Sequence, residues 1–250
     1  MTKWRPAKAA QMLLLEPRTE CFGQEAIGTG IIPVCGSARS GKSTLALALM
    51  EWAAEHTQRD LVFMGLPDAY IEALPPKMRS RATNPPMAEL SKQRDAIVLM
   101  DDTATNLSSR DSGSNQGRMI SRVSGVISHL GLTIILTTQS MAGIDLSLLR
   151  FTMMSPLVKR VDAMALRVER SEWSNEIKEA QSELSRFNFE RSMYWSIADE
   201  HICKAPYSEW MGQDILSRPF RYLEQDELEL IINGPSQAAK RKKVKKNVTE

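Results

Sequence analysis

The sequence comprises 250 residues, of which 42% are hydrophobic and 25% charged, and these proportions are ordinary for a globular protein with a sizeable core. No apolar run approaches the ~20 residues that a membrane-spanning helix needs, and no long apolar region follows the first residues, so we expect neither a membrane span nor a signal peptide. The net charge of +2 excludes a chain that is broadly basic over its whole length.

A phosphate-binding loop is the first strong signal along the chain. Residues 1–29 are predicted to form an N-terminal extension, and an apolar run at 31–35 then leads into Gly-Ser-Ala-Arg-Ser-Gly-Lys-Ser at 36–43. An apolar helical segment follows to about residue 56. This is a complete G-x-x-x-x-G-K-[ST] motif in the strand–loop–helix setting that the motif requires. A chance glycine- and serine-rich turn is the alternative, and the flanking segments disfavour it.

The residue types of this loop predict a nucleoside triphosphate, with ATP as the candidate, together with Mg²⁺. Two glycines permit backbone turns that a side chain would forbid, so that consecutive N–H groups point inward. Lys42 is expected to reach the β and γ phosphates, and the Ser43 hydroxyl to bind Mg²⁺. The predicted nucleotide-binding residues are Gly36, Ser37, Ala38, Arg39, Ser40, Gly41, Lys42, Ser43 and Thr44.

A short second strand is predicted at residues 61–64, followed by a proline-rich insertion at 65–95. The prolines favour an irregular excursion that contains a little helix over a regular crossover. Basic residues at 77–81 would suit the lid of a small-molecule P-loop kinase, which is an alternative function for the chain.

An acidic pair closes the next predicted strand. Residues 96–100 are apolar and lead directly into Asp101 and Asp102, which is typical of a buried parallel strand with carboxylates at its carboxyl end. Asp101 is the candidate to hold Mg²⁺, and Asp102 is the candidate to orient and deprotonate the attacking water. The alternative is that one of the two aspartates caps the segment that follows.

A third strand with a polar tip is predicted after a polar loop at 103–117 and an amphipathic helix that ends near residue 130. This strand covers residues 132–136 and ends in Thr-Thr-Gln-Ser. Gln139 is the candidate to sense the γ-phosphate or hold the water, and Thr138 is the second choice. An ordinary loop start is the alternative, because polar strand ends are common.

The C-terminal part, residues 160–235, is predicted to elaborate the domain. We expect a strand at 151–154, one long helix over 161–187, and a hairpin formed by 193–197 and 201–204. Six basic residues lie at 240–246, within a disordered tail at 236–250, and the rest of the chain has 26 basic against 30 acidic residues. The tail is a candidate for contacts to nucleic-acid phosphates, with a merely solubilising end as the alternative.

These elements predict an α/β P-loop NTPase fold of the RecA/ASCE type, with a central, mainly parallel sheet flanked by helices and a C-terminal helical and hairpin extension. The ATPase domain would cover residues 30–235. One predicted strand lies in sequence between the strand before the phosphate loop (the Walker A strand) and the strand that ends in the acidic pair (the Walker B strand), and another strand follows. This sequence order is expected of the P-loop division in which an added strand lies between the two Walker strands in the sheet. No Asn-Lys-x-Asp motif is present, which argues against a GTPase. The three cysteines lack metal-ligand spacing and suit a reducing compartment.

The segment from residue 101 to 170 resembles the FtsK–HerA superfamily of DNA-pumping ATPases, and most closely the genome-packaging ATPases of icosahedral viruses with an internal membrane. The likeness covers roughly residues 30–170. It implies that Lys42 and Ser43 bind phosphate and metal, that Asp101 binds the metal and that Gln139 is the sensor glutamine. Asp102 stands where many relatives carry glutamate. The candidates for an arginine that acts on a neighbouring subunit's site are Arg122 and Arg150, ahead of Arg118 and Arg110.

The resemblance implies an ATP-hydrolysing translocase of double-stranded DNA that packages a viral genome into a preformed capsid. Its implied partners are other copies of the chain in a pentameric or hexameric ring, and proteins of the capsid vertex or viral membrane. Its implied location is the host cell cytoplasm or the packaging vertex of the virion. A cellular DNA-pumping ATPase, the small-molecule kinase and a nucleotide-gated assembly factor remain as alternatives.

Overall fold

The structure, a computed structural model, describes residues 17–101 except 20, 21 and 27, then 125–143, and 155–227 except 168, 170, 220, 222, 225 and 226. Several predictions concern other residues: most of the N-terminal extension, the loop at 103–117, the strand at 151–154 and the basic tail. Within the described ranges, no helix has the length and apolar character needed to cross a membrane.

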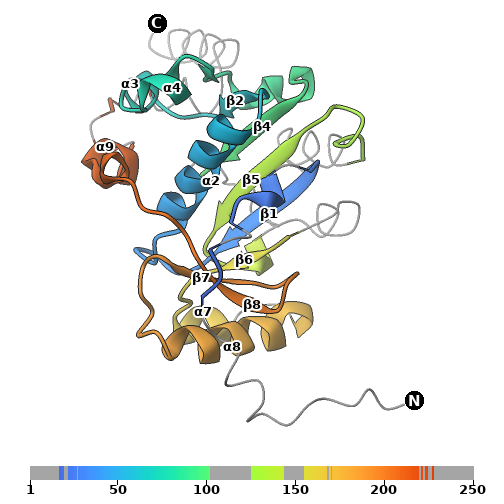
Figure 1. Cartoon of the computed structure of the whole chain (residues 1–250), viewed down its shortest axis with the longest axis vertical. Helices are drawn as coiled ribbons and strands as arrows, with labels where there is room; N and C mark the ends of the chain where they lie inside the picture. Colours follow the sequence, from blue (N-terminus) through green and yellow to red (C-terminus); the bar gives the residue numbers. More distant parts are fainter. Residues whose placement is uncertain are drawn as a thin grey trace, which may run out of the picture.

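An eight-stranded sheet runs through the middle of the molecule (Figure 1). The strand order is β3-β2-β4-β5-β1-β6-β7-β8; the pairings from β3 to β6 are parallel, and β6–β7 and β7–β8 are antiparallel. The strands are β1 (Gly30–Cys35), β2 (Asp60–Phe63), β3 (Ala82–Thr83), β4 (Ala96–Met100), β5 (Thr133–Thr138), β6 (Leu157–Val158), β7 (Met193–Ser196) and β8 (His201–Lys204).

The position of β5 confirms the predicted class of fold. β5 pairs in parallel with β1 on one side and with β4 on the other, so a strand separates the phosphate-loop strand from the acidic strand. The sequence does not give this spatial order directly. Because the carboxyl ends of parallel strands lie at one edge of a sheet, the segments that follow β1, β4, β5 and β6 all meet there.

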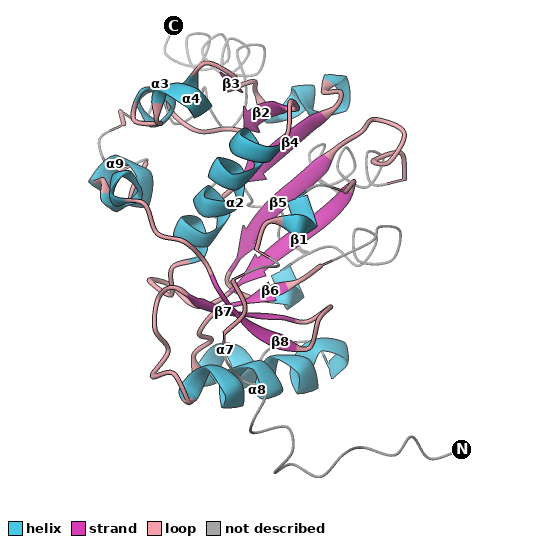
Figure 2. Cartoon of the chain, in the orientation of Figure 1, coloured by secondary structure: helices cyan, strands magenta, loops and turns pink. Residues whose placement is uncertain are grey.

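Helices cover both faces of the sheet (Figure 2). Side chains of the buried strands alternate between two apolar layers, as strand geometry requires. Ile97 and Leu99 join the layer that contains α2, whereas Val98 and Met100 join the layer that contains Ile177 of α8. The helices are α2 (Lys42–His56), α3 (Asp68–Glu72), α4 (Pro76–Arg79), α7 (Ala163–Arg167), α8 (Ser171–Ser185) and α9 (Asp214–Ser217), with short 3₁₀ turns η2 (Gln24–Ala26), η3 (Met87–Lys92), η5 (Met141–Gly143) and η6 (Glu209–Gly212).

The prediction of one long helix over 161–187 is wrong. The structure has two helices, α7 and α8, and Glu169, which lies between them, is not helical. The Glu169 carboxylate accepts hydrogen bonds from the Ser140 hydroxyl at 2.9 Å and from the Met141 backbone N–H at 3.0 Å. These bonds hold Glu169 against the residues that follow β5. The apolar periodicity of the sequence continues past residue 169, so it does not show that the helix is interrupted there.

Two other predictions need refinement. The predicted hairpin exists as β7 and β8, but it extends the central sheet through β6 instead of forming a separate appendage. The insertion at 65–95 contains the short helices expected of it, and also the edge strand β3, which the sequence analysis missed. A two-residue strand is too short to give a periodic signal.

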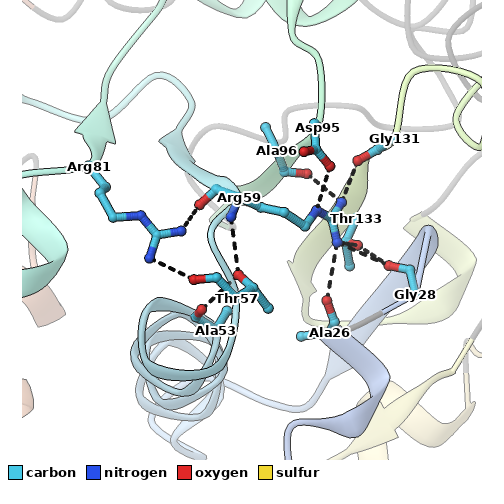
Figure 3. Close-up of polar contacts among 10 residues, drawn as sticks. All are labelled: Ala26, Gly28, Ala53, Thr57, Arg59, Arg81, Asp95, Ala96, Gly131 and Thr133. Carbon is cyan, nitrogen blue, oxygen red and sulfur yellow. Dashed lines mark hydrogen bonds and ion pairs between the residues drawn. The ribbon is translucent and has the colours of Figure 1, made fainter.

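Arg59 is the centre of a polar cluster at the amino ends of the strands (Figure 3). Its guanidinium donates to the carbonyl oxygens of Ala26 and Gly28 at 3.3 Å, of Ala96 at 2.9 Å and of Gly131. It also donates to the Thr133 hydroxyl at 2.8 Å and lies 3.5 Å from the Asp95 carboxylate. One side chain therefore joins the starts of β1, β4 and β5, at the edge of the sheet opposite the phosphate loop.

Replacing Arg59 by methionine is expected to lower the free energy of unfolding by about 3 kcal/mol, because several buried carbonyl groups lose a charged donor. Chemical denaturation measures this change. Arg94 is a suitable control, since it is exposed and, within the described ranges, bonds only to the nearby carbonyls of Ser91 and Gln93. If Arg94→Met cost as much stability as Arg59→Met, the cluster would have no special role.

The two ends of the described chain pack onto this framework. The segment after β8 runs past α2 to α9 (Figure 1), and both Ser208 Oγ and Trp210 Nε1 donate to the Glu51 carboxylate of α2 at 2.7 Å. At the other end, Arg18 forms a bridge with β8: its N–H donates to the Ile202 carbonyl at 3.1 Å, and its carbonyl accepts from the Lys204 N–H at 3.0 Å.

Candidate nucleotide-binding site

The predicted phosphate loop leaves β1 and is held by the two neighbouring strand ends. The Gly36 N–H donates to the Thr138 carbonyl of β5 at 3.1 Å, and the Ser37 N–H donates to the Arg160 carbonyl after β6 at 2.8 Å. The Asp162 N–H donates to the Ser37 hydroxyl at 2.6 Å. The loop then turns directly into α2, which begins at Lys42.

The two motif glycines are required by the space around them. A Cβ atom at Gly36 would lie 2.6 Å from Ser40 Oγ and 2.8 Å from Lys159 Cβ, closer than real contacts allow. Gly41 has a φ of 91°, a left-handed conformation that residues with a side chain rarely adopt. Ala38 and Arg39 form the exposed tip between them.

Ser43 and Asp101 are brought together although they lie 58 residues apart. The Ser43 hydroxyl donates to Asp101 Oδ1 at 3.2 Å, and the Asp101 side chain is buried. Lys42 is also buried, and its Nζ donates to the Ser37 carbonyl at 3.2 Å across the loop. The predicted phosphate lysine, metal hydroxyl and metal carboxylate are therefore near one another at one edge of the sheet.

Thr137 contributes to this site, and the sequence analysis missed it. Its hydroxyl donates to Asp101 Oδ1 at 2.5 Å. The reason is strand register: Met100 of β4 pairs with Leu136 of β5, so the next residue of each strand is adjacent. Gln139 lies at an exposed position two residues further on. The Thr138 hydroxyl donates to the Ser140 carbonyl. Among the described polar tip residues, Thr137 is the one that contacts the carboxylate.

Tyr70 is a further residue near Asp101 that the sequence did not single out. It lies on α3, just after β2, and is fully buried. Its hydroxyl has no hydrogen-bond partner among the residues that the structure describes. Burial raises the pKa of this hydroxyl well above its ordinary value, and the negative charge of Asp101 raises it further. Tyr70 is therefore a neutral phenol beside the acidic strand end at any physiological pH.

Lys159 lies beneath the loop and is only 1% exposed. Its Nζ donates to the Met193 carbonyl at 2.7 Å and to the Arg191 carbonyl at 2.5 Å. Burial, and next the positive charge of Arg191, lower the pKa of Lys159 from 10.5 to about 7, whereas Glu190 opposes the shift. A neutral amine has two N–H groups, which match the two carbonyl acceptors.

The free energy of unfolding is expected to rise with pH between about 7 and 10.5 because of Lys159. In this window the unfolded chain binds a proton at this residue and the folded chain does not, which gives a slope of up to about 1.4 kcal/mol per pH unit. Below the window both states are protonated and above it both are neutral, so the slope disappears. Denaturation of the native protein and of Lys159→Met at several pH values isolates the contribution, because other groups cancel in the difference. Equal slopes would contradict the assignment.

The remaining predicted site residues lie outside the described residues. These are Asp102, Arg122 and Arg150, together with the second-choice arginines at positions 110 and 118. Their roles stay predictions from the sequence.

The residues present fit a nucleoside triphosphate and Mg²⁺. The Ser40 hydroxyl is buried within the loop and has no partner in the described part of the chain, which suits a site built to receive phosphate oxygens. The amino end of α2 and the Lys42 side chain add positive charge there. Ser43 and Asp101 offer the hard oxygen ligands that Mg²⁺ prefers.

Sheet order and loop together define a P-loop NTPase fold of the division with an added strand between the Walker strands. No model of a known protein family matches the chain, and neither does any curated protein. Solved structures similar to it include the genome-packaging NTPase B204 of Sulfolobus turreted icosahedral virus 2 in complex with ATP-gammaS. The identity is 12% and the TM-score 0.47, over 71% of this chain and 97% of that one.

Two further solved structures are also similar. EccC (ATPases 2 and 3) of Thermomonospora curvata, in complex with a signal sequence peptide, has 13% identity and a TM-score of 0.46, over 87% of this chain and 43% of that one. The cytoplasmic domain of EssC has 16% identity and a TM-score of 0.40, over 58% of this chain and 34% of that one. Likenesses of this size assign no function.

Proposed function

We propose that the chain is an ATPase that translocates double-stranded DNA and packages a viral genome into a preformed capsid. The observation that carries the ATPase part is the contact between Ser43 and Asp101, which joins the phosphate loop to a buried carboxylate across the added strand. The DNA part rests on the resemblance of the segment 101–170 to the sequences of packaging ATPases.

Each side chain of the site has its own role in the transfer of the γ-phosphoryl group of ATP to water, which leaves ADP. The loop N–H groups and Lys42 bind the β and γ phosphates, while Ser43 and Asp101 hold Mg²⁺, with Thr137 fixing the carboxylate. Bound Mg²⁺ neutralises negative charge on the phosphates. Asp102 orients and deprotonates the attacking water, and Gln139 holds that water or senses the γ-phosphate.

Assembly completes the site in this proposal. Copies of the chain form a pentameric or hexameric ring, and Arg122 or Arg150 of one subunit reaches the phosphates bound by its neighbour. DNA contacts are made to backbone phosphates and carry no sequence preference. The basic residues at 240–246 are one source of such contacts. Proteins of the capsid vertex or viral membrane are the partners. DNA packaging takes place in the host cytoplasm or at the packaging vertex of the virion.

ATP hydrolysis with and without linear double-stranded DNA tests the proposal, with the native chain compared with Asp102→Asn. DNA is expected to stimulate hydrolysis severalfold in the native chain, and the variant is expected to lose hydrolysis in both conditions. Heparin serves as the control, because it is a polyanion without base pairs.

Each outcome has a distinct meaning. Stimulation by DNA and not by heparin favours the translocase. Equal stimulation by DNA and heparin would mean that the chain responds to negative charge and not to DNA as such, which would contradict the translocase. A hydrolysis rate that DNA does not change would contradict the translocase function and favour the kinase or the nucleotide-gated assembly factor. Full activity of Asp102→Asn would overturn the assignment of that residue as the base.

A further inference from the structure

Lys159 presents a problem that the proposed ATPase mechanism leaves open. A lysine that is only 1% exposed costs more free energy to bury than an apolar side chain of the same length. Its side chain lies against the loop, close to both Gly36 and Gly41.

The path of this side chain follows the loop. A Cβ atom at Gly36 would lie 2.8 Å from Lys159 Cβ, and a Cβ atom at Gly41 would lie 3.5 Å from Lys159 Cε and 3.7 Å from Nζ. The Lys159 side chain thus runs beneath the loop from its first glycine to its second. Its backbone N–H donates to the Cys35 carbonyl at 2.8 Å, which fixes where this path begins.

The far end of the side chain reaches the C-terminal hairpin. Backbone pairing of β6 with β7 ends at Val158 and Trp195. Beyond that point, Lys159 Nζ donates to the Arg191 and Met193 carbonyls. A side chain therefore joins the segment after β6 to the start of β7, where the two backbones no longer pair. The Arg191 carbonyl is also 3.4 Å from the Cβ position of Gly41.

A second support comes from α8. The Gln181 amide donates to the Lys159 carbonyl at 3.0 Å and accepts from the Val161 N–H at 2.7 Å. The backbone on both sides of Lys159 is therefore bonded to α8.

We propose that Lys159 is a positioning residue of the phosphate loop, which it holds in its binding shape by joining Gly36 and Gly41 to the start of β7. The inference rests on the proposed nucleotide-binding function and adds to it a dependence of nucleotide affinity on the C-terminal hairpin. Lys159 touches no substrate in this role.

Lys159→Met tests the role because methionine is unbranched and of similar volume, though one atom shorter, and cannot donate to the two carbonyl groups. Arg59→Met is the matched control: Arg59 is a partly buried basic residue that, like the fully buried Lys159, donates to backbone carbonyls, but at the opposite edge of the same sheet. Affinity is measured with a fluorescent ATP analogue, well below the unfolding temperature of each variant. Hydrogen exchange of the amides at 36–43 is measured without nucleotide.

Lys159→Met is expected to weaken nucleotide binding about tenfold or more and to raise KM more than it lowers kcat, because the lost loop geometry serves bound substrate and transition state alike. Its loop amides should exchange faster. Arg59→Met should be less stable than the native protein yet bind nucleotide and protect the loop normally.

Two results would overturn the proposal: unchanged affinity and loop exchange in Lys159→Met, or equal losses in both variants, which would indicate general destabilisation. If the native chain binds no nucleotide, the proposed function fails, and the exchange comparison still decides whether Lys159 positions the loop.

Discussion

Alanine in place of Lys42 is expected to abolish ATP hydrolysis, with a loss of at least about 100-fold in kcat/KM. Lys42 is buried at the start of α2, and its Nζ lies 3.2 Å from the Ser37 carbonyl on the opposite side of the loop. That position places a fixed positive charge where the phosphates enter. Steady-state hydrolysis and titration with a fluorescent nucleotide measure the two parts of the effect.

The matched control is Lys77→Ala. Lys77 is an exposed lysine of α4 that lies 3.8 Å from Glu55, and exposed ion pairs of this kind contribute little to stability. It should leave hydrolysis unchanged, unless residues 77–81 form the lid of a kinase. Native hydrolysis by Lys42→Ala would mean that the loop at 36–43 is not the nucleotide site.

Asparagine in place of Asp101 is expected to remove Mg²⁺-dependent hydrolysis, again by about 100-fold or more, while nucleotide still binds in the absence of Mg²⁺. Asparagine keeps the shape of the side chain, and its carbonyl oxygen still accepts from Ser43 and Thr137. The change therefore removes the negative charge with little effect on packing. The measurement is a Mg²⁺ titration of hydrolysis, compared with nucleotide binding in a chelator.

Asp95→Asn provides the control on the same strand. Asp95 precedes β4 at its amino end, pairs with Arg59 and is 82% exposed, whereas Asp101 follows the carboxyl end and is buried. Asp95→Asn should keep the Mg²⁺ dependence of the native protein. An unchanged Mg²⁺ dependence in Asp101→Asn would remove that residue from the metal site.

Sequence alone was sufficient for the parts of the site that are continuous in the chain. The loop at 36–43 is a local motif, and Asp101 follows an apolar run whose end is easily identified. The class of fold followed from the sequence order of such runs. All these signals depend on neighbours within a few residues.

The contacts that the sequence did not reveal depend on distant partners. Thr137 meets Asp101 only because β4 and β5 pair in one register, and a shift of one residue would turn its hydroxyl to the other face. Lys159 has the appearance of an ordinary surface lysine in sequence, and its burial becomes visible only when β7 and the phosphate loop are in place. The break between α7 and α8 likewise depends on the bonds of Glu169 to Ser140 and Met141.

The two end strands of the described sheet, β3 and β8, offer little unpaired backbone for strand-to-strand pairing with another copy of the chain. An unpaired strand edge is a template for the edge of another molecule. Here β3 ends the sheet with only two residues, and at the far end the backbone of Arg18 takes up hydrogen bonds along β8. A shortened protein that begins at residue 30 would lose this cover, along with the buried Phe22 and Ala26. Such a fragment is expected to self-associate even if its nucleotide site is intact.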